Sequence, residues 1–135
     1  MAGKPFFDTN ILVYAYTLDE PRSERATGLL ASGGVVSVQI LNEFVNVSRR
    51  KLKFSWDSVS RALAHFRLLL DPPIPLTVEM HADAVELSRR HGFAFYDSLV
   101  LSAAKRGGCR ILYTEDLQDG QTVEGVLIRN PFAQA

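Results

Sequence analysis

Four acidic residues occupy positions where the surrounding sequence predicts apolar packing or the end of a buried strand: Asp8, Glu43, Asp97 and Asp116. Burying an unpaired charge is costly, so such an acid is normally neutralised, paired or bound to a metal. Four converging carboxylates would also repel one another unless cations lay between them. Hard oxygen ligands suit Mg²⁺ or Mn²⁺, and these ions can deprotonate a water and stabilise charge on a phosphoryl group. The acids therefore predict a metal-dependent phosphodiester hydrolase.

Asp8 and Asp116 each follow an apolar stretch that predicts a strand. The apolar run from Phe6 to Tyr16, with Asp8 within it, is a first strand or a strand running into a helix, and the stretch 109–113 precedes Asp116. Ligands of open α/β sheets bind outside the carboxyl ends of the strands, so both acids are expected on one edge of the sheet. The alternative for Asp8 is a turn residue or a helix N-cap, with Thr9 as the other candidate for the cap.

Glu43 and Asp97 lie on predicted helices, each on the apolar face. Glu43 is three residues from Ile40 and four from Val47, and Asp97 is three residues from Val100. Residues at these spacings are neighbours on a helix surface. Two alternatives remain open: Glu43 at the edge of the apolar stripe with its head in water, and Asp97 as a first-turn acid favoured by the helix dipole. It is the occurrence of all four acids together that favours a common site.

Predicted strands and helices alternate along the whole chain. Helices are expected over about 20–33, 38–51, 55–71, 77–91 and 97–106. Besides the first strand, strands are expected at 35–37, 109–113 and 126–128, with 74–76 as an edge strand or a connector. This order predicts the α/β class with a parallel sheet covered on both faces. The helix pair within about 38–70 is longer than one crossover requires and is expected to project as a helical arm.

Composition narrows the class of protein. The 135 residues suit one domain, predicted to span 1–135. Lys plus Arg and Asp plus Glu both number 15, so the net charge is zero and argues against a mainly electrostatic nucleic-acid binder, while leaving room for a basic patch. The single cysteine excludes an internal disulfide. No stretch approaches the length of a membrane span, and the protein is expected to be soluble and cytoplasmic.

The four acids and their flanking residues form an ordered set of short motifs. These are Asp8-Thr9-Asn10-Ile11, Asn42-Glu43-Phe44, Tyr96-Asp97-Ser98-Leu99 with Ala103-Ala104, and Thr114-Glu115-Asp116-Leu117. In this order and spacing the set resembles the PIN domain, and most closely the VapC-type toxins of toxin–antitoxin pairs. The resemblance covers nearly the whole chain.

The resemblance implies a three-layer α/β/α fold with a central parallel sheet of four to five strands. It implies an endoribonuclease that uses Mg²⁺ or Mn²⁺, forms a homodimer and is inhibited by a small cognate antitoxin. Asp8, Glu43, Asp97 and Asp116 match the catalytic and metal-binding acids in order. Asn10 and Thr114 match the positions that orient them. Two nearby carboxylates, those of Glu115 and Asp119, are alternatives for the fourth acid.

The mechanism implied by the resemblance is attack of a metal-bound water on a backbone phosphate. Asp8, Asp97 and Asp116 would hold one metal, and Glu43 would help to hold it or a second. Three rival functions stay open. A phosphatase of the haloacid-dehalogenase type is disfavoured because Asn10 stands where that chemistry needs a general acid. A catalytically silent binding module and a nuclease acting on DNA are the others.

The densest cationic run lies at the end of the helix that carries Glu43: Arg49, Arg50, Lys51 and Lys53. It is a candidate contact for RNA phosphates, and equally a cationic helix C-terminus favoured by the dipole. Aromatic residues are candidates for stacking on bases, but more often form core or interface: Tyr14, Tyr16, Trp56 and Phe95. The three histidines lack ligand spacing and are assigned no chemistry, and Cys109 is expected to be a small buried hydrophobe.

Overall fold

The sheet at the centre of the fold joins strands from both ends of the chain. The computed structural model describes residues 3–133. Its strands are β1 (Phe6–Phe7), β2 (Ile111–Tyr113), β3 (Thr122–Val123) and β4 (Val126–Arg129). They lie in the order β1-β2-β4-β3. β1 with β2 and β2 with β4 are parallel, and β3 is antiparallel to β4. The predicted central parallel sheet is confirmed, with one antiparallel strand added at its edge.

Two expected strand segments are reduced to single bridges. Phe6 pairs with Val35, and Ser37 pairs with Ile74, both in the parallel sense. The segment 35–37 therefore continues the sheet beyond β1 without forming a strand of its own. The segment 74–76 is a connector, which is one of the two alternatives that its proline predicts.

Six helices carry the rest of the described chain: α1 (Thr9–Tyr14), α2 (Glu20–Ala31), α3 (Val38–Arg50), α4 (Trp56–Leu69), α5 (Val78–His91) and α6 (Phe95–Arg106). Three of them begin at the expected cap. The side chains of Ser37, Ser55 and Thr77 each accept a hydrogen bond from a backbone N–H three residues on. α6 begins two residues before its predicted start, and Asp97 consequently lies inside its first turn.

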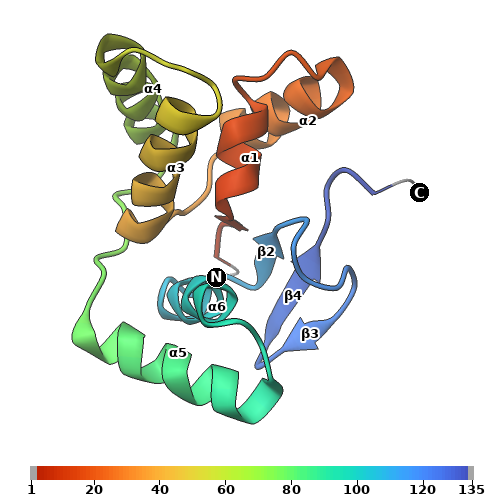
Figure 1. The fold of residues 1–135 in the computed structure, drawn as a ribbon. Helices are drawn as coiled ribbons and strands as arrows, with labels where there is room; N and C mark the ends of the chain where they lie inside the picture. Colours follow the sequence, from red (N-terminus) through yellow and green to blue (C-terminus); the bar gives the residue numbers. More distant parts are fainter. Residues whose placement is uncertain (1–2, 134–135) are drawn as a thin grey trace.

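The helices form two layers with the sheet between them (Figure 1). α5 and α6 pack against each other, and α6 contacts β2 and β4. α1 packs on α2 and α3, and α3 packs on α4. In Figure 1 the antiparallel helices α3 and α4 extend away from the sheet. They are the helix pair that the sequence predicts to project as an arm. Among the described helices none is long and apolar enough to cross a bilayer.

The segment that contains β1 and α1 contributes four completely buried side chains to the core. Phe6 and Phe7 of β1 are completely buried, as are Ile11 and Leu12 of α1. A Cβ at Gly34 would collide with the Phe7 ring, so the loop before the 35–37 segment approaches β1 as closely as only glycine allows. The strand-to-helix junction that contains Asp8 is therefore anchored by apolar packing on both of its sides.

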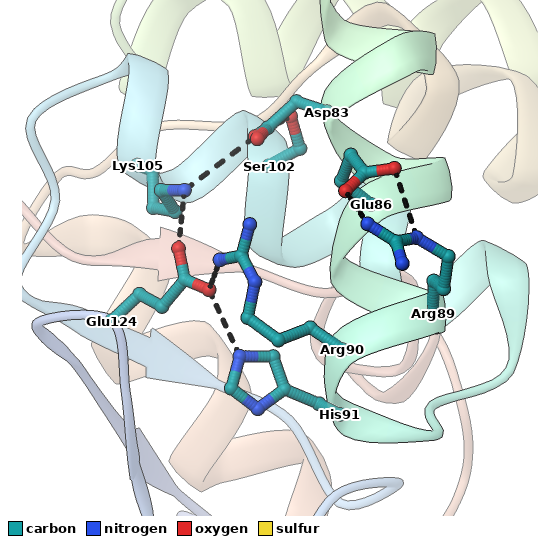
Figure 2. Close-up of polar contacts among 8 residues, drawn as sticks. All are labelled: Asp83, Glu86, Arg89, Arg90, His91, Ser102, Lys105 and Glu124. Atoms are coloured by element: carbon teal, nitrogen blue, oxygen red, sulfur yellow. Dashed lines mark hydrogen bonds and ion pairs between the residues drawn. The ribbon is translucent and has the colours of Figure 1, made fainter.

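The β3–β4 hairpin was not predicted from the sequence. Its two-residue turn consists of Glu124 and Gly125, with φ angles of 48° and 89°. Two positive φ values in a two-residue loop are typical of a type I′ turn, in which asparagine and glycine are the usual residues. Glu124 is an unusual choice, and its side chain lies in a polar cluster with α5 and α6 (Figure 2).

Candidate active site

The carboxyl ends of β1 and β2 place Asp8 and Asp116 at one edge of the sheet. Phe7 lies opposite Tyr113, and the Asp8 backbone N–H donates to the Tyr113 carbonyl at 3.0 Å. The chain then leaves β2 through Thr114 and reaches Asp116 two residues later. Parallel pairing of neighbouring strands is therefore the reason that two acids more than a hundred residues apart face the same cleft.

α3 and α6 bring the other two acids to this edge. Glu43 lies in the middle of α3, where the Thr9 hydroxyl donates to its Oε1 atom at 2.9 Å. Asp97 lies in the first turn of α6. The side chains of all four acids line one cleft of about 390 Å³. Its other lining residues are Thr9, Asn10, Val13, Tyr14, Val47, Lys51, Tyr96, Val100 and Glu115.

A short hydrogen-bond chain fixes the orientation of Asp8 and Asp116. The buried Thr114 hydroxyl donates to Oδ2 of Asp8 at 2.7 Å and accepts the backbone N–H of Asp116 at 3.1 Å. The Asn10 side-chain amide donates to Oδ2 of Asp116 at 3.3 Å. Asn10 and Thr114 thus contact the acids that they were expected to orient. Thr9 contacts Glu43 in the same way. Nothing in the sequence indicates this contact except that Thr9 lies in the same short motif as Asp8 and Asn10.

The Asp8 carboxylate both caps helix α1 and faces the cleft residue Asp116 through Thr114. Its Oδ1 accepts the Thr9 backbone N–H at 2.7 Å, which makes it the N-cap of α1. Its Oδ2 faces Thr114. The capping alternative and the site hypothesis for Asp8 are therefore compatible, because one carboxylate oxygen serves each.

The cleft raises the pKa of its acids. Asp8 is only 6% exposed, and burial raises its pKa from 3.8 to about 7 against the opposing effect of hydrogen bonds from Thr114 and Thr9. Burial is also the main cause of the raised pKa of Glu43 and of Asp97. The negative charge of Asp116 raises all three further. The fold thus brings like charges together, and no basic side chain of the described residues 3–133 pairs with them.

The donors in the cleft suit a hard divalent cation. Within the described residues 3–133, none of the four acids forms an ion pair with a basic side chain. The buried Oδ1 atom of Asn10 is a further oxygen, and it has no hydrogen-bond partner in the part of the chain that the structure describes. Unpaired carboxylates with a free amide oxygen are the ligand type that Mg²⁺ and Mn²⁺ prefer. Within the same residues no three His, Cys, Asp or Glu side chains already have the arrangement of a metal site.

The two alternative acids near Asp116 occupy different positions. Glu115 lines the cleft, and its Oε1 accepts the Tyr14 hydroxyl at 2.9 Å. Asp119 instead accepts the Asn130 backbone N–H at 2.8 Å and is not among the residues that line the cleft. Asp119 therefore stabilises the loop before β3, and Asp116 remains the better candidate for the fourth acid.

The basic run divides into separate environments. Lys51 lines the cleft, and it is the one Lys or Arg among the described residues that does so. The Arg49 guanidinium stacks on the Trp56 ring at 4.5 Å and donates to the Phe54 carbonyl at 2.8 Å. Arg50 and Lys53 are exposed and outside the cleft lining. The structure thus favours Lys51 within the run.

Among the other residues considered from the sequence, Tyr14 lines the cleft and Trp56 is 60% exposed outside it. Tyr16 packs edge-on against Phe54 and Phe66, as core aromatics do. Cys109 is buried, and burial raises the pKa of its thiol to about 11, which disfavours the reactive thiolate. His91, which was assigned no chemistry, contacts Glu124 outside the cleft.

Comparison with known proteins agrees with this architecture. The family model described as PIN domain matches residues 6–118. A search of curated protein sequences finds no match. Three solved structures share the fold. The Mycobacterium tuberculosis toxin VapC20, described as cleaving the sarcin–ricin loop, is 22% identical with a TM-score of 0.63, over 83% of this chain and 89% of its own.

The other two structures are complexes. A toxin–antitoxin complex from Klebsiella pneumoniae is 17% identical with a TM-score of 0.71, over 95% of this chain and 98% of the matched one. VapBC2 from Rickettsia felis, bound to a promoter DNA fragment, is 21% identical with a TM-score of 0.65, over 93% of this chain and 97% of the matched one. At these identities the three structures establish a shared fold.

Proposed function

Because the chain belongs to the PIN domain family, we propose that it is a metal-dependent endoribonuclease of the VapC toxin type. The observation that carries the proposal is the cleft lined by Asp8, Glu43, Asp97 and Asp116 at the carboxyl edge of the sheet. Carboxylates gathered without basic partners are expensive for stability, and a bound divalent cation would offset that cost. The likeness of the fold to a toxin described as cleaving the sarcin–ricin loop supports a nucleolytic activity for this chain.

Asp8, Asp97 and Asp116 would hold Mg²⁺ or Mn²⁺, with Glu43 beside it or holding a second ion. When bound, such an ion acidifies a water and stabilises charge on a phosphoryl group. Thr114 holds the Asp8 carboxylate in one orientation, and Asn10 does so for Asp116. Thr9 occupies Oε1 of Glu43, so that Oε2 is the atom we assign to receive the proton of the attacking water. The raised pKa of Glu43 suits this role.

Two features bear on the rival chemistry and on partners. Asn10 donates to Asp116 and supplies no acid for a phosphoaspartate mechanism, which favours the nuclease over a phosphatase. Two of the similar structures are toxin–antitoxin assemblies, which supports a small cognate antitoxin as the inhibitor of this chain. We propose in addition that the protein acts as a homodimer in the cytoplasm, with Lys51 contacting RNA phosphate.

The test is cleavage of a mixed RNA pool by the purified protein in Mg²⁺ or Mn²⁺. Cutting that disappears with EDTA and in Asp8→Asn is the expected result, and mapping the fragment ends gives the cleavage site. A single-stranded DNA pool of matched length separates RNA from DNA specificity. Absence of cutting together with absence of Mn²⁺ binding by calorimetry would overturn the nuclease proposal and leave a binding module.

A further inference from the structure

A second hollow lies beside the cleft, and of its described lining residues Glu43 alone has a role in the proposed mechanism. It has a volume of about 330 Å³ and is lined by Gln39, Asn42, Glu43, Asn46 and Tyr96. Glu43 and Tyr96 line the cleft as well, so the two depressions share a wall. A group held in the hollow would therefore be adjacent to a phosphate held in the cleft.

One side of the hollow is a row of side-chain amides on α3. Gln39, Asn42 and Asn46 are separated by three and four residues and so share one face of the helix. Asn42 and Asn46 are exposed and Gln39 is half-buried, and the Asn42 amide donates to Oε1 of Gln39 at 3.5 Å. A side-chain amide has two N–H donors and an oxygen with two lone pairs, so this contact leaves each of the two side chains a further donor and acceptor. Each amide offers both a hydrogen-bond donor and an acceptor, which is the combination that pairs with the edge of a nucleobase.

The ring of Tyr96 is the aromatic part of the lining. The residue is 61% exposed, although it sits in the first turn of α6 directly before Asp97. The ring of Phe95 packs against it edge-on, with the centroids 5.7 Å apart. Leaving a large aromatic surface in water is unfavourable, and a flat exposed ring next to a nuclease cleft is suited to stacking on an unpaired base.

We propose that this hollow binds one unpaired nucleobase of the RNA, next to the phosphate that is cleaved. The base stacks on Tyr96, and the amides of Asn42 and Asn46, with Gln39, contact its edge. The proposal rests on the proposed function for the identity of the polymer. It makes the hollow a determinant of sequence preference at one nucleotide position.

The charge of the lining favours a base over a phosphate. Among the described residues that form the hollow there is no Lys or Arg, and the one ionisable acid is Glu43. A phosphate would be repelled by that carboxylate and would find no cation, whereas a neutral heterocycle can use the amides. The phosphate contacts are left to the cleft, which Lys51 lines.

The test measures RNA binding in the Asp8→Asn background, so that binding is read without cleavage. The probes are fluorescein-labelled single-stranded oligo(rA), oligo(rC) and oligo(rU), and an abasic strand of the same length. Tyr96→Leu is expected to raise the Kd for the base-bearing strands by roughly tenfold, and Tyr96→Phe, which keeps the ring, by less than about twofold. The abasic strand should have the same Kd for the protein with Tyr96 intact and for Tyr96→Leu.

The amide row is tested through base preference. Asn42→Ala and Asn46→Ala are expected to reduce the ratio of Kd values between the best and the worst homopolymer by roughly fivefold or more. Gln121→Ala is the matched control, because it removes a side-chain amide directly before β3 that is not among the residues lining the hollow. Cleavage-site mapping of each variant with Asp8 intact should show the same loss of preference at one nucleotide.

The outcomes separate the two proposals. Tyr96-dependent binding without any metal-dependent cleavage by the protein with Asp8 intact would overturn the nuclease proposal and leave the hollow standing. Cleavage that persists while Tyr96→Leu binds all strands as before would overturn the hollow alone. If Tyr96→Leu instead converts a dimer to a monomer in solution and leaves the Kd unchanged, the hollow is a protein interface and the inference is wrong.

Discussion

Two clusters of charged side chains in this protein shift the pKa of a carboxylate in opposite directions. In the cleft, Asp8, Glu43 and Asp97 have raised pKa values because they are buried beside other acids. At the β3–β4 turn, Glu124 has its pKa lowered to about 2, chiefly by the hydrogen bonds from Lys105 and His91. The cleft therefore disfavours the ionised form of its acids. The cluster at the β3–β4 turn favours the ionised form of Glu124.

The Glu124 cluster joins three elements (Figure 2). Lys105 of α6 contacts Oε1 of Glu124 at 2.8 Å, and His91 at the end of α5 contacts Oε2 at 2.9 Å. Arg90 binds the same Oε2. The contacts hold a non-glycine residue at positive φ, a conformation that costs of the order of 1 kcal/mol or more unless its surroundings stabilise it.

The difference shows which cluster serves stability and which serves chemistry. A paired carboxylate stabilises the fold at neutral pH, whereas gathered and unpaired carboxylates are tolerated where a site needs them. The two clusters should therefore respond to pH and to substitution in opposite directions.

Asp8→Asn should lower the cleavage rate by more than about 100-fold while stabilising the metal-free protein. The pKa of Asp8 rises from 3.8 unfolded to about 7 folded, so the folded state loses stability as pH rises through this range. Three pKa units correspond to at most about 4 kcal/mol at pH 8, and the amide recovers part of that. Urea unfolding in EDTA at pH 5 and pH 8 measures the change.

The pH profile supplies the control for Asp8→Asn. The unsubstituted protein should lose free energy of unfolding between about pH 4 and about pH 7, and the variant should lose less. A variant that is less stable at both pH values would mean that the Asp8 contacts with Thr9 and Thr114 outweigh its burial.

Thr114→Val should reduce cleavage by about 10- to 100-fold, because it removes the hydroxyl that orients Asp8 and that accepts the Asp116 N–H. The buried site should also lose about 1–3 kcal/mol of stability, since the Asp116 N–H loses its acceptor. Thr114→Ser retains the hydroxyl and is the matched control. If valine and serine have equal activity, the hydroxyl does not position the acids.

Lys51→Gln should weaken RNA binding and reduce the slope of log Kd against log salt by up to about 1, the contribution of one phosphate contact. Arg50→Gln, in the same run but outside the cleft lining, should change the slope less. Fluorescence anisotropy between about 50 and 200 mM salt measures both. Equal effects would mean that the whole run binds RNA as a diffuse patch.

Glu124→Gln should cost about 1 kcal/mol of stability and leave cleavage within about twofold, because partly exposed ion pairs are screened by water. The lowered pKa means that this stability is present above pH 4.5 and lost as pH falls towards 2. Glu86→Gln is the control: its pair with Arg89 lies on the exposed face of α5 and should matter less. A large loss of activity in Glu124→Gln would show that the two clusters are coupled.

Local sequence was sufficient for the caps and for the periodicity of the long helices. Ser37, Ser55 and Thr77 are caps because a hydroxyl before an apolar-periodic segment satisfies a free backbone N–H whatever lies beyond it. Local sequence was not sufficient for the two-residue strand β3. A segment that short carries no period, and its pairing depends on the turn at Glu124 and on contacts with α5 and α6.

For the site, the sequence by itself supplied the four acids, because a charge within an apolar pattern stands out in one dimension. The resemblance of the short motifs to a known family supplied Asn10 and Thr114. Only the tertiary structure decided which side chains share a cleft. In the folded chain the Thr9 hydroxyl contacts Glu43, and Asp119 lies outside the cleft that Asp116 lines. Lys51 is the residue of the basic run that lines the cleft, and Tyr96 lies exposed beside a row of amides. These contacts join residues far apart in the chain, and their geometry is fixed by strand pairing and helix packing, which no local preference encodes.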